Sequence, residues 1–225
     1  PGREDHEVSD PDKKQAKVRL RELEILTAEI ELEEKELKLD MLRISHNAKH
    51  ISHGPSQDIG RGIFRLESGV YDEVLSLASV IERWAAQNPG EAIRLYIFSP
   101  GGSVFHGFAL YDTLRTVSEA GHEVTTVVRG FAGSMASVVF LAGDVRLIGA
   151  ESYIHQHEGS SGVVGSSSAI REEAEFMKRL GEKVARIYAT RTSLTAAQFK
   201  AKIRKKEWFA ESDEAVRLGI ATAVG

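Results

Sequence analysis

Residues 92–104 read Ala-Ile-Arg-Leu-Tyr-Ile-Phe-Ser-Pro-Gly-Gly-Ser-Val. The first seven of these residues are largely apolar, which is typical of a buried β-strand. The glycines that follow, Gly101 and Gly102, let backbone N–H groups approach a ligand closely because no Cβ stands in the way. An ordinary type II turn at Pro100-Gly101 is the alternative. The stretch therefore predicts a buried strand that ends in a ligand-binding loop or in a plain turn.

A second stretch, Gly130-Phe-Ala-Gly-Ser-Met-Ala136, places Ser134 among small residues just before the apolar run 138–142. Small neighbours allow a tight backbone turn and leave the serine hydroxyl accessible. A helix over the apolar run would direct its first N–H groups toward Ser134, where an oxyanion would form in acyl transfer. Similar stretches are common in strand-to-helix turns, so this one alone does not separate a nucleophile from a structural serine.

Two histidines are candidates for a general base. Residues 153–157, Tyr-Ile-His-Gln-His, alternate as a strand, so His155 and His157 face the same side. The six other histidines lack such a setting and are expected to be solvated: His6, His46, His50, His53, His106 and His122.

Together these stretches resemble the proteolytic subunit of the Clp protease family. Residues 107–114, Gly-Phe-Ala-Leu-Tyr-Asp-Thr-Leu, are similar to a further helix of that family, and the resemblance covers essentially all of the chain from Gly60 onward. The alternation of strands and helices by itself predicts an α/β domain with mostly parallel strands. The resemblance implies the family's form of it, a crotonase-like superhelix of β-β-α units with the long helix 168–191 as a protruding handle.

The resemblance also implies the roles of the site residues. Ser134 matches the family's nucleophile, and Gly102 and Met135 match the residues whose amides form its oxyanion hole. The family's catalytic histidine often stands in "I-H-Q", which favours His155. The register of residues 150–153 with the family's Pro-Asn-Ser-Arg, and the spacing of the downstream glycines, favour His157 instead. We therefore expect His157 to be the base, with His155 as the alternative.

The third member of the predicted triad departs from the family. Residues 209–219 match the family's F-x-x-x-x-E-A-V-x-x-G, and Glu207 takes the place of the aspartate that precedes it. A carboxylate is kept, so the imidazole can still be held in one tautomer and its cation stabilised. The alternative is that Glu207 is a surface residue of the charged run 200–207, in which case Asp213 is the next candidate.

Composition is compatible with this interpretation. The chain of 225 residues has a formal net charge of −4 with acidic and basic residues well mixed, which argues against a dedicated nucleic-acid surface. It contains no cysteine, which excludes disulfides and thiolate metal sites. No apolar run long enough to span a membrane and no signal peptide is apparent, so we expect a cytoplasmic protein. No cofactor or metal is expected for the chemistry.

The sequence divides near residue 57. Residues 13–43 are rich in Leu, Glu and Lys, and Val18, Ile25, Leu32 and Leu39 lie seven apart. This heptad spacing predicts a long amphipathic helix that requires a partner. We therefore expect residues 1–57 to form an N-terminal extension with a helix and a linker, and residues 58–225 to form the peptidase-like domain.

The resemblance implies a serine endopeptidase subunit that hydrolyses peptide bonds of unfolded proteins. It further implies a homo-oligomeric ring, a heptamer or double heptamer, and a separate AAA+ unfoldase as partner, since the chain has no phosphate-binding loop of its own. The alternatives are a weakly active or non-catalytic ring subunit, a peptidase of the viral head-maturation type, and a crotonase-type hydratase or isomerase.

Overall fold

In the computed structural model the described residues are 15, 19, 21 and 59–225. The chain divides into two compact units, residues 1–52 and 53–225, and the second contains the whole described range 59–225. The predicted N-terminal helix and linker lie outside the described residues except for Gln15, Arg19 and Arg21, which are helical and exposed. The boundary at residue 57 and the role of the extension stay predictions.

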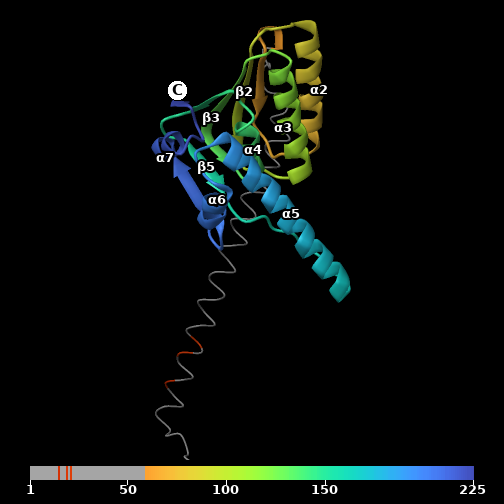
Figure 1. The fold of residues 1–225 in the computed structure, drawn as a ribbon, viewed down its shortest axis with the longest axis vertical. Coiled ribbons are helices and arrows are strands. Elements are labelled where there is room, and N and C mark those ends of the chain that lie inside the picture. Colours follow the sequence, from red (N-terminus) through yellow and green to blue (C-terminus); the bar gives the residue numbers. More distant parts are fainter. Residues whose placement is uncertain (1–14, 16–18, 20, 22–58) are drawn as a thin grey trace, which may run out of the picture. The chain divides into compact units, whose positions relative to one another are not determined.

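The second unit is built on one mixed sheet, most of whose strands run parallel (Figure 1). Its main path has the order β1-β2-β3-β4-β7, and every neighbouring pair in it is parallel. These strands are β1 (Ile63–Leu66), β2 (Ile93–Ser99), β3 (Val124–Gly133), β4 (Val145–Ile148) and β7 (Ala223–Val224). The predicted α/β class with a mostly parallel sheet is confirmed.

Strand β3 is longer than the predicted strand at 124–128 because its two halves pair with different strands. Residues 125–128 pair with β4, whereas residues 131–133 pair with β5 (Tyr153–Gln156). Between the halves, Gly130 has a φ of 82° and its N–H donates to Ser152 Oγ at 2.8 Å. Strand β5 also pairs with β6 (Trp208–Glu211), in the antiparallel direction. The end of β3 therefore lies beside β5, which carries His155 and is followed by His157, and the strand that pairs with β5 in turn, β6, directly follows Glu207.

The remaining elements of this unit are helices. They are η1 (Ile59–Arg61), α2 (Asp72–Gln87), α3 (Val104–Glu119), α4 (Met135–Phe140), α5 (Ser167–Arg191), α6 (Ala196–Ile203) and α7 (Ser212–Arg217). Helices α2 and α3 lie side by side, and α5 extends away from the rest of the unit (Figure 1). Its buried residues, Ala185 and Tyr188, lie near its C-terminal end, where it reaches the core. Helix α6 was not predicted.

The core explains why the predicted strand and nucleophile helix form where they do. In β2 the residues Ile93, Leu95 and Ile97 are fully buried, and the residues between them are less so. Helix α4 is buried on all sides, with none of its six residues more than 3% exposed. A short helix of this kind is held by packing rather than by helix propensity. Among the described residues, no helix combines the length and apolarity that a membrane span requires.

Candidate active site

Ser134 stands at the turn between β3 and α4 in a strained backbone conformation. Its φ is 48° and its ψ is −123°. Among the described non-glycine residues, only Ser134 and Lys205 have a positive φ. Such a conformation costs on the order of 1–3 kcal/mol and persists only when the surrounding structure imposes it. A strained serine at a strand-to-helix turn is the arrangement that exposes the nucleophile in α/β-hydrolases.

The backbone of Ser134 is fixed on both sides. Its N–H donates to the carbonyl of His155 at 2.9 Å, which extends the pairing of β3 with β5. Its carbonyl accepts hydrogen bonds from Ser137 Oγ at 2.8 Å and from Gln156 Nε2 at 2.9 Å. The hydroxyl of Ser134 does not cap helix α4. These contacts hold the turn while leaving the hydroxyl outside the network.

The glycine loop after β2 lies against this turn. A Cβ on Gly101 would stand 2.7 Å from Ser134 Cβ and 2.9 Å from Met135 N, and Gly101 has a φ of +92°. Both the close approach and the backbone conformation therefore require glycine at this position. The observed loop is thus more than a turn, because it brings β2 into contact with the residues of the β3–α4 turn.

The backbone N–H groups of Gly102 and Met135 are the two predicted oxyanion donors. Val70 lies opposite Gly102 in a parallel β-bridge. The Val70 N–H donates to the Gly101 carbonyl at 2.9 Å, and the Val70 carbonyl accepts from the Ser103 N–H at 2.8 Å. This parallel bridge uses the groups that flank Gly102 and leaves the N–H of Gly102 itself for another acceptor. Met135 is the first residue of α4, where an N–H has no intrahelical partner. The two predicted oxyanion donors therefore lie on the two segments that meet at Ser134.

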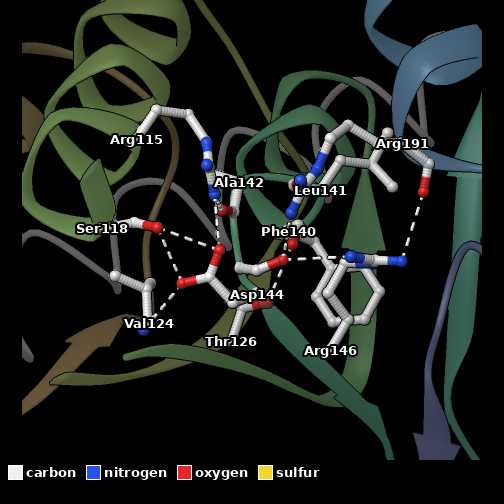
Figure 2. Close-up of polar contacts among 11 residues, drawn as sticks. Arg115, Ser118, Val124, Thr126, Phe140, Leu141, Ala142, Asp144, Arg146 and Arg191 are labelled. Atoms are coloured by element: carbon white, nitrogen blue, oxygen red, sulfur yellow. Dashed lines mark hydrogen bonds and ion pairs between the residues drawn. The ribbon is translucent and has the colours of Figure 1, made fainter. Parts of the chain in front are cut away.

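The far end of α4 is held by side chains from four other elements (Figure 2). Arg191 Nε donates to the Leu141 carbonyl at 2.9 Å, and Arg115 Nη1 donates to that of Ala142 at 3.1 Å. The Gly143 carbonyl accepts from both Arg191 and Arg146, and the Phe140 carbonyl accepts from Thr126 Oγ1 at 2.8 Å. Cationic donors at a helix C-terminus satisfy carbonyls that have no intrahelical partner. The helix that begins beside Ser134 is thereby anchored at its other end.

Asp144 completes this arrangement. It accepts hydrogen bonds from Arg115 at 2.7 Å, from the Ser118 hydroxyl and from the Val124 N–H. Partial burial by itself would raise the pKa of Asp144, but the hydrogen bonds from these three groups outweigh it and hold the pKa below its ordinary value.

The candidate histidines and Glu207 lie together, but not in the predicted pairing. His155 Nε2 lies 2.5 Å from Glu207 Oε2. His157 stacks on His155 with ring centroids 5.4 Å apart, and His155 also stacks on Phe131 and Phe209. Among the described residues, Glu207 forms its hydrogen bond with His155, and no bond joins His157 to Glu207 or to Ser134. The structure thus brings both imidazoles and the carboxylate into one cluster, in which Glu207 is bonded to His155 and His157 stacks on it.

The register of the strands explains this closeness. Strands β5 and β6 pair Gln156 with Trp208, so His157 and Glu207 are the next residues outward on the two strands. Because side chains alternate along a strand, His155, His157 and Glu207 share one face. The glutamate side chain is long enough to reach back to His155. Asp213, the fallback carboxylate, is exposed in the first turn of α7.

A second chain of serine, histidine and carboxylate was missed from the sequence. Ser103 Oγ lies 2.7 Å from His106 Nδ1, and His106 Nε2 lies 3.1 Å from Asp72 Oδ1. Ser103 has an ordinary φ of −59° and is the N-cap of α3, and the Asp72 side chain is 96% exposed. The serine before an apolar helical pattern was the signal that could have revealed this cap. Its geometry is that of a helix N-terminus, which makes Ser103 a natural control for Ser134.

The expectation that both remaining described histidines are solvated is wrong. His106 is only partly exposed in the cluster above. His122 is buried, and its Nδ1–H donates to the Glu91 carbonyl at 2.8 Å.

The fold and the site define an α/β protein that presents a strained serine between a glycine loop and a histidine–carboxylate cluster. The sequence model of the Clp protease family matches residues 61–225. The chain therefore belongs to the Clp protease family, as the sequence motifs indicated, and the predicted fold class is confirmed with it.

Individual relatives agree with this assignment. The chain is similar to the ATP-dependent Clp protease proteolytic subunit 3 of Rhodococcus jostii, with 38% identity over 142 residues, which cover 62% of this chain and 68% of the relative. It is 33% identical over 141 residues to the proteolytic subunit of Deinococcus radiodurans, covering 62% of this chain and 67% of that relative. It is 32% identical over 176 residues to proteolytic subunit 1 of Streptomyces coelicolor, covering 74% of this chain and 78% of that relative.

Proposed function

We propose that this chain is a serine endopeptidase subunit of a Clp-type protease. The observation that carries the proposal is the conformation of Ser134, whose positive φ is stabilised from both sides while its hydroxyl takes no part in capping α4. Strain at a polar residue that the fold maintains is more readily explained by reactivity than by stability.

In this proposal Ser134 Oγ attacks the carbonyl carbon of a peptide bond. The general base, His157 or alternatively His155, takes the hydroxyl proton and later gives it to the leaving amine. The N–H groups of Gly102 and Met135 stabilise the negative charge on the carbonyl oxygen of the tetrahedral intermediate. Water then hydrolyses the acyl-enzyme with the same imidazole as base. Glu207 stabilises the imidazolium that forms in each step.

The partners follow from the relatives rather than from the site. The relatives are named proteolytic subunits of ATP-dependent proteases. For this chain we accordingly propose an unfolded protein or peptide as substrate, assembly into a homo-oligomeric ring, and an ATP-driven unfoldase as a separate partner.

Labelling with a fluorophosphonate probe tests the proposal directly, because the probe phosphonylates only activated serines. Wild-type protein should be labelled at Ser134, located by peptide mapping, and Ser134→Ala should not be labelled. The Ser103→Ala variant should keep the label, since Ser103 is a helix cap. Absence of labelling in the folded wild-type protein would favour a non-catalytic subunit. Loss of the label in Ser103→Ala alone would move the nucleophile to the Ser103–His106–Asp72 chain.

Peptide cleavage separates the other candidates. A crotonase-type hydratase or isomerase would act on an acyl thioester without needing Ser134, whereas the proposed peptidase should lose cleavage of a fluorogenic peptide in Ser134→Ala. A peptidase with a narrow maturation role would label at Ser134 but cleave few unfolded proteins.

A further inference from the structure

A buried polar network contacts the backbone carbonyl of Ser134. Ser137 Oγ lies 2.8 Å from Tyr188 Oη and 2.8 Å from the carbonyl of Ser134. Gln156 Nε2 lies 2.8 Å from Ser137 Oγ and 2.9 Å from the same carbonyl. Ser137 and Tyr188 are fully buried, and Gln156 is 4% exposed. None of the three groups has a role in the chemistry proposed above.

The donors and acceptors of this network fix its direction. A serine hydroxyl has one proton to donate, and the Ser134 carbonyl can only accept. If Ser137 donates to that carbonyl, it must accept from Gln156 and from Tyr188. Gln156 supplies one N–H to each of its two partners. Tyr188 must then be the donor to Ser137, and burial raises the pKa of its hydroxyl, so that it keeps its proton.

The network joins Ser134 to a different part of the fold. Tyr188 belongs to α5 and is, with Ala185, one of the two buried residues of that helix. Its ring stacks on Phe199 of α6 with centroids 4.1 Å apart, and Phe199 in turn contacts Trp208, the residue after Glu207. The ring is thus held by packing, so that its hydroxyl reaches Ser137 from a fixed position.

We propose that Ser137, Gln156 and Tyr188 are positioning residues that hold the Ser134 carbonyl and so maintain the strained backbone that aims the Ser134 hydroxyl. Ser137 is the central member because its hydroxyl forms hydrogen bonds with both other side chains and with the carbonyl. Tyr188 acts through Ser137, which makes the C-terminal end of α5 part of the support of the nucleophile. This inference rests on the proposed role of Ser134 as nucleophile.

The test compares the rate of fluorophosphonate labelling, together with kcat and KM for a fluorogenic peptide, in four full-length proteins. These are wild type, Ser137→Ala, Tyr188→Phe and the double variant. We expect labelling and kcat to fall about tenfold in Ser137→Ala and about threefold in Tyr188→Phe, with KM little changed, because misalignment of a nucleophile affects the chemical step. The double variant should match Ser137→Ala, since residues that act through one contact are not additive.

Stability is measured in parallel, and rates are expressed per folded protein. Tyr111→Phe is the control, because Tyr111 is a partly buried tyrosine of α3 packed against the core and has no bond to this network. A purely structural role would lower the melting temperature without changing the rate per folded protein, and that result would overturn the proposal. Additive effects in the double variant would overturn the relay through Ser137. If Ser137→Ala does not fold, the rates per folded protein of Tyr188→Phe and Tyr111→Phe still test the positioning role, since Tyr188→Phe keeps the ring that stacks on Phe199.

Failure of this inference is distinguishable from failure of the proposed function. If wild type is not labelled at Ser134, the proposed function fails. If wild type is labelled and both single variants react at its rate, only the positioning role fails.

Discussion

Glu207 Oε2 lies 2.5 Å from His155 Nε2, so the carboxylate predicted to orient His157 is bonded to the neighbouring imidazole instead. The rings of His155 and His157 are stacked with an angle of 11° between their planes and centroids 5.4 Å apart. A single carboxylate thus stands beside two imidazoles on one face of β5. Substitution of each histidine in turn tests which imidazole Glu207 orients during catalysis.

Substitution of the two histidines separates their roles. If His157 is the base, His157→Ala should lower kcat about a thousandfold or more, as loss of a triad member does. His155→Ala should keep a measurable fraction of activity, because it would remove only a neighbour of Glu207. Steady-state cleavage of a fluorogenic peptide measures both. The opposite order of activities would assign the base to His155, the imidazole that Glu207 contacts in this structure.

Substitution of Glu207 tests the carboxylate. Glu207→Gln should lower kcat strongly with little change in stability, because the side chain is 59% exposed and an exposed ion pair stabilises a fold by at most about 1 kcal/mol. Glu207→Asp should keep the activity of wild type or raise it, since aspartate is the residue expected at this position in the Clp protease family. Glu211→Gln is the control, because Glu211 is an exposed glutamate at the end of β6, the strand that follows Glu207. Unchanged kcat in both Glu207 variants would make Glu207 a surface residue, and Asp213 would be substituted next.

The close approach of the glycine loop to Ser134 gives a third prediction. In Gly101→Ala the new Cβ would meet the Gly133 carbonyl at 2.5 Å and Ser134 Cβ at 2.7 Å. Because both neighbours belong to the strained turn, the loop must move away, and we expect labelling of Ser134 to fall about a hundredfold or more. Such a change resembles the loss of an oxyanion donor in magnitude.

Gly121→Ala is a matched control for this prediction. Gly121 has a φ of +100°, similar to that of Gly101, but nothing lies within 4 Å of the position of its added Cβ. Both variants therefore suffer backbone strain of about 1 kcal/mol or more, measured by chemical denaturation. Only Gly101→Ala should lose labelling per folded protein. An equal loss in both variants would attribute the effect to strain rather than to contact with Ser134.

The sequence predicted those parts of the fold and the site that depend on local patterns. The apolar run 92–98 indicated β2, and the glycines and small residues indicated the loop and turn that meet at Ser134. The spacing from the family's motifs placed Glu207 within one cluster with both histidines. The strand, the loop and the turn are encoded by neighbours in the chain, which is why they could be recognised, whereas the placement of Glu207 came from the family's motifs.

Contacts between distant elements could not be predicted in the same way. The bond of Tyr188 to Ser137 depends on how α5 packs on α4, and nothing in the helical pattern of α5 distinguishes that tyrosine from another core residue. Likewise, β3 extends to Gly133 because residues 131–133 pair with β5, and the sequence of residues 129–133 does not indicate a strand by itself. His122 is buried because Glu91 supplies a carbonyl for its ring, a partner from another loop.

The N-terminal extension gives a prediction that rests on sequence alone. A helix with the heptad seam Val18, Ile25, Leu32 and Leu39 gains most of its stability from packing against a partner. Removal of residues 1–57 should leave a folded domain that labels at Ser134 but should change the oligomer mass or the access of large substrates. Light scattering and the ratio of cleavage of an unfolded protein to that of a short peptide report these effects. The same mass and the same ratio in both proteins would make the extension a passive appendage.

The pKa of Asp144 predicts a pH dependence of stability that is separate from catalysis. Because hydrogen bonds from Arg115, Ser118 and the Val124 N–H hold this pKa below its ordinary value despite partial burial, the folded state binds the proton less readily than the unfolded state. The carboxylate therefore stabilises the fold at pH values above the ordinary aspartate pKa of about 4. This stabilisation is lost as the pH falls through the lower folded-state pKa.

Asp144→Asn should consequently lower the free energy of unfolding by about 1 kcal/mol at neutral pH, a modest amount because the group remains in contact with water. The difference from wild type should stay constant between about pH 5 and pH 7 and shrink below about pH 4. Urea denaturation at a series of pH values measures it, and Asp112→Asn, at an exposed position of α3, is the control with an expected change within about 0.5 kcal/mol. Since Asp144 supports Arg115 at the C-terminal end of α4, labelling of Ser134 per folded protein shows whether that anchor also reaches the site. A difference between Asp144→Asn and wild type that persisted unchanged at pH 3 would mean that the carboxylate charge is not its cause.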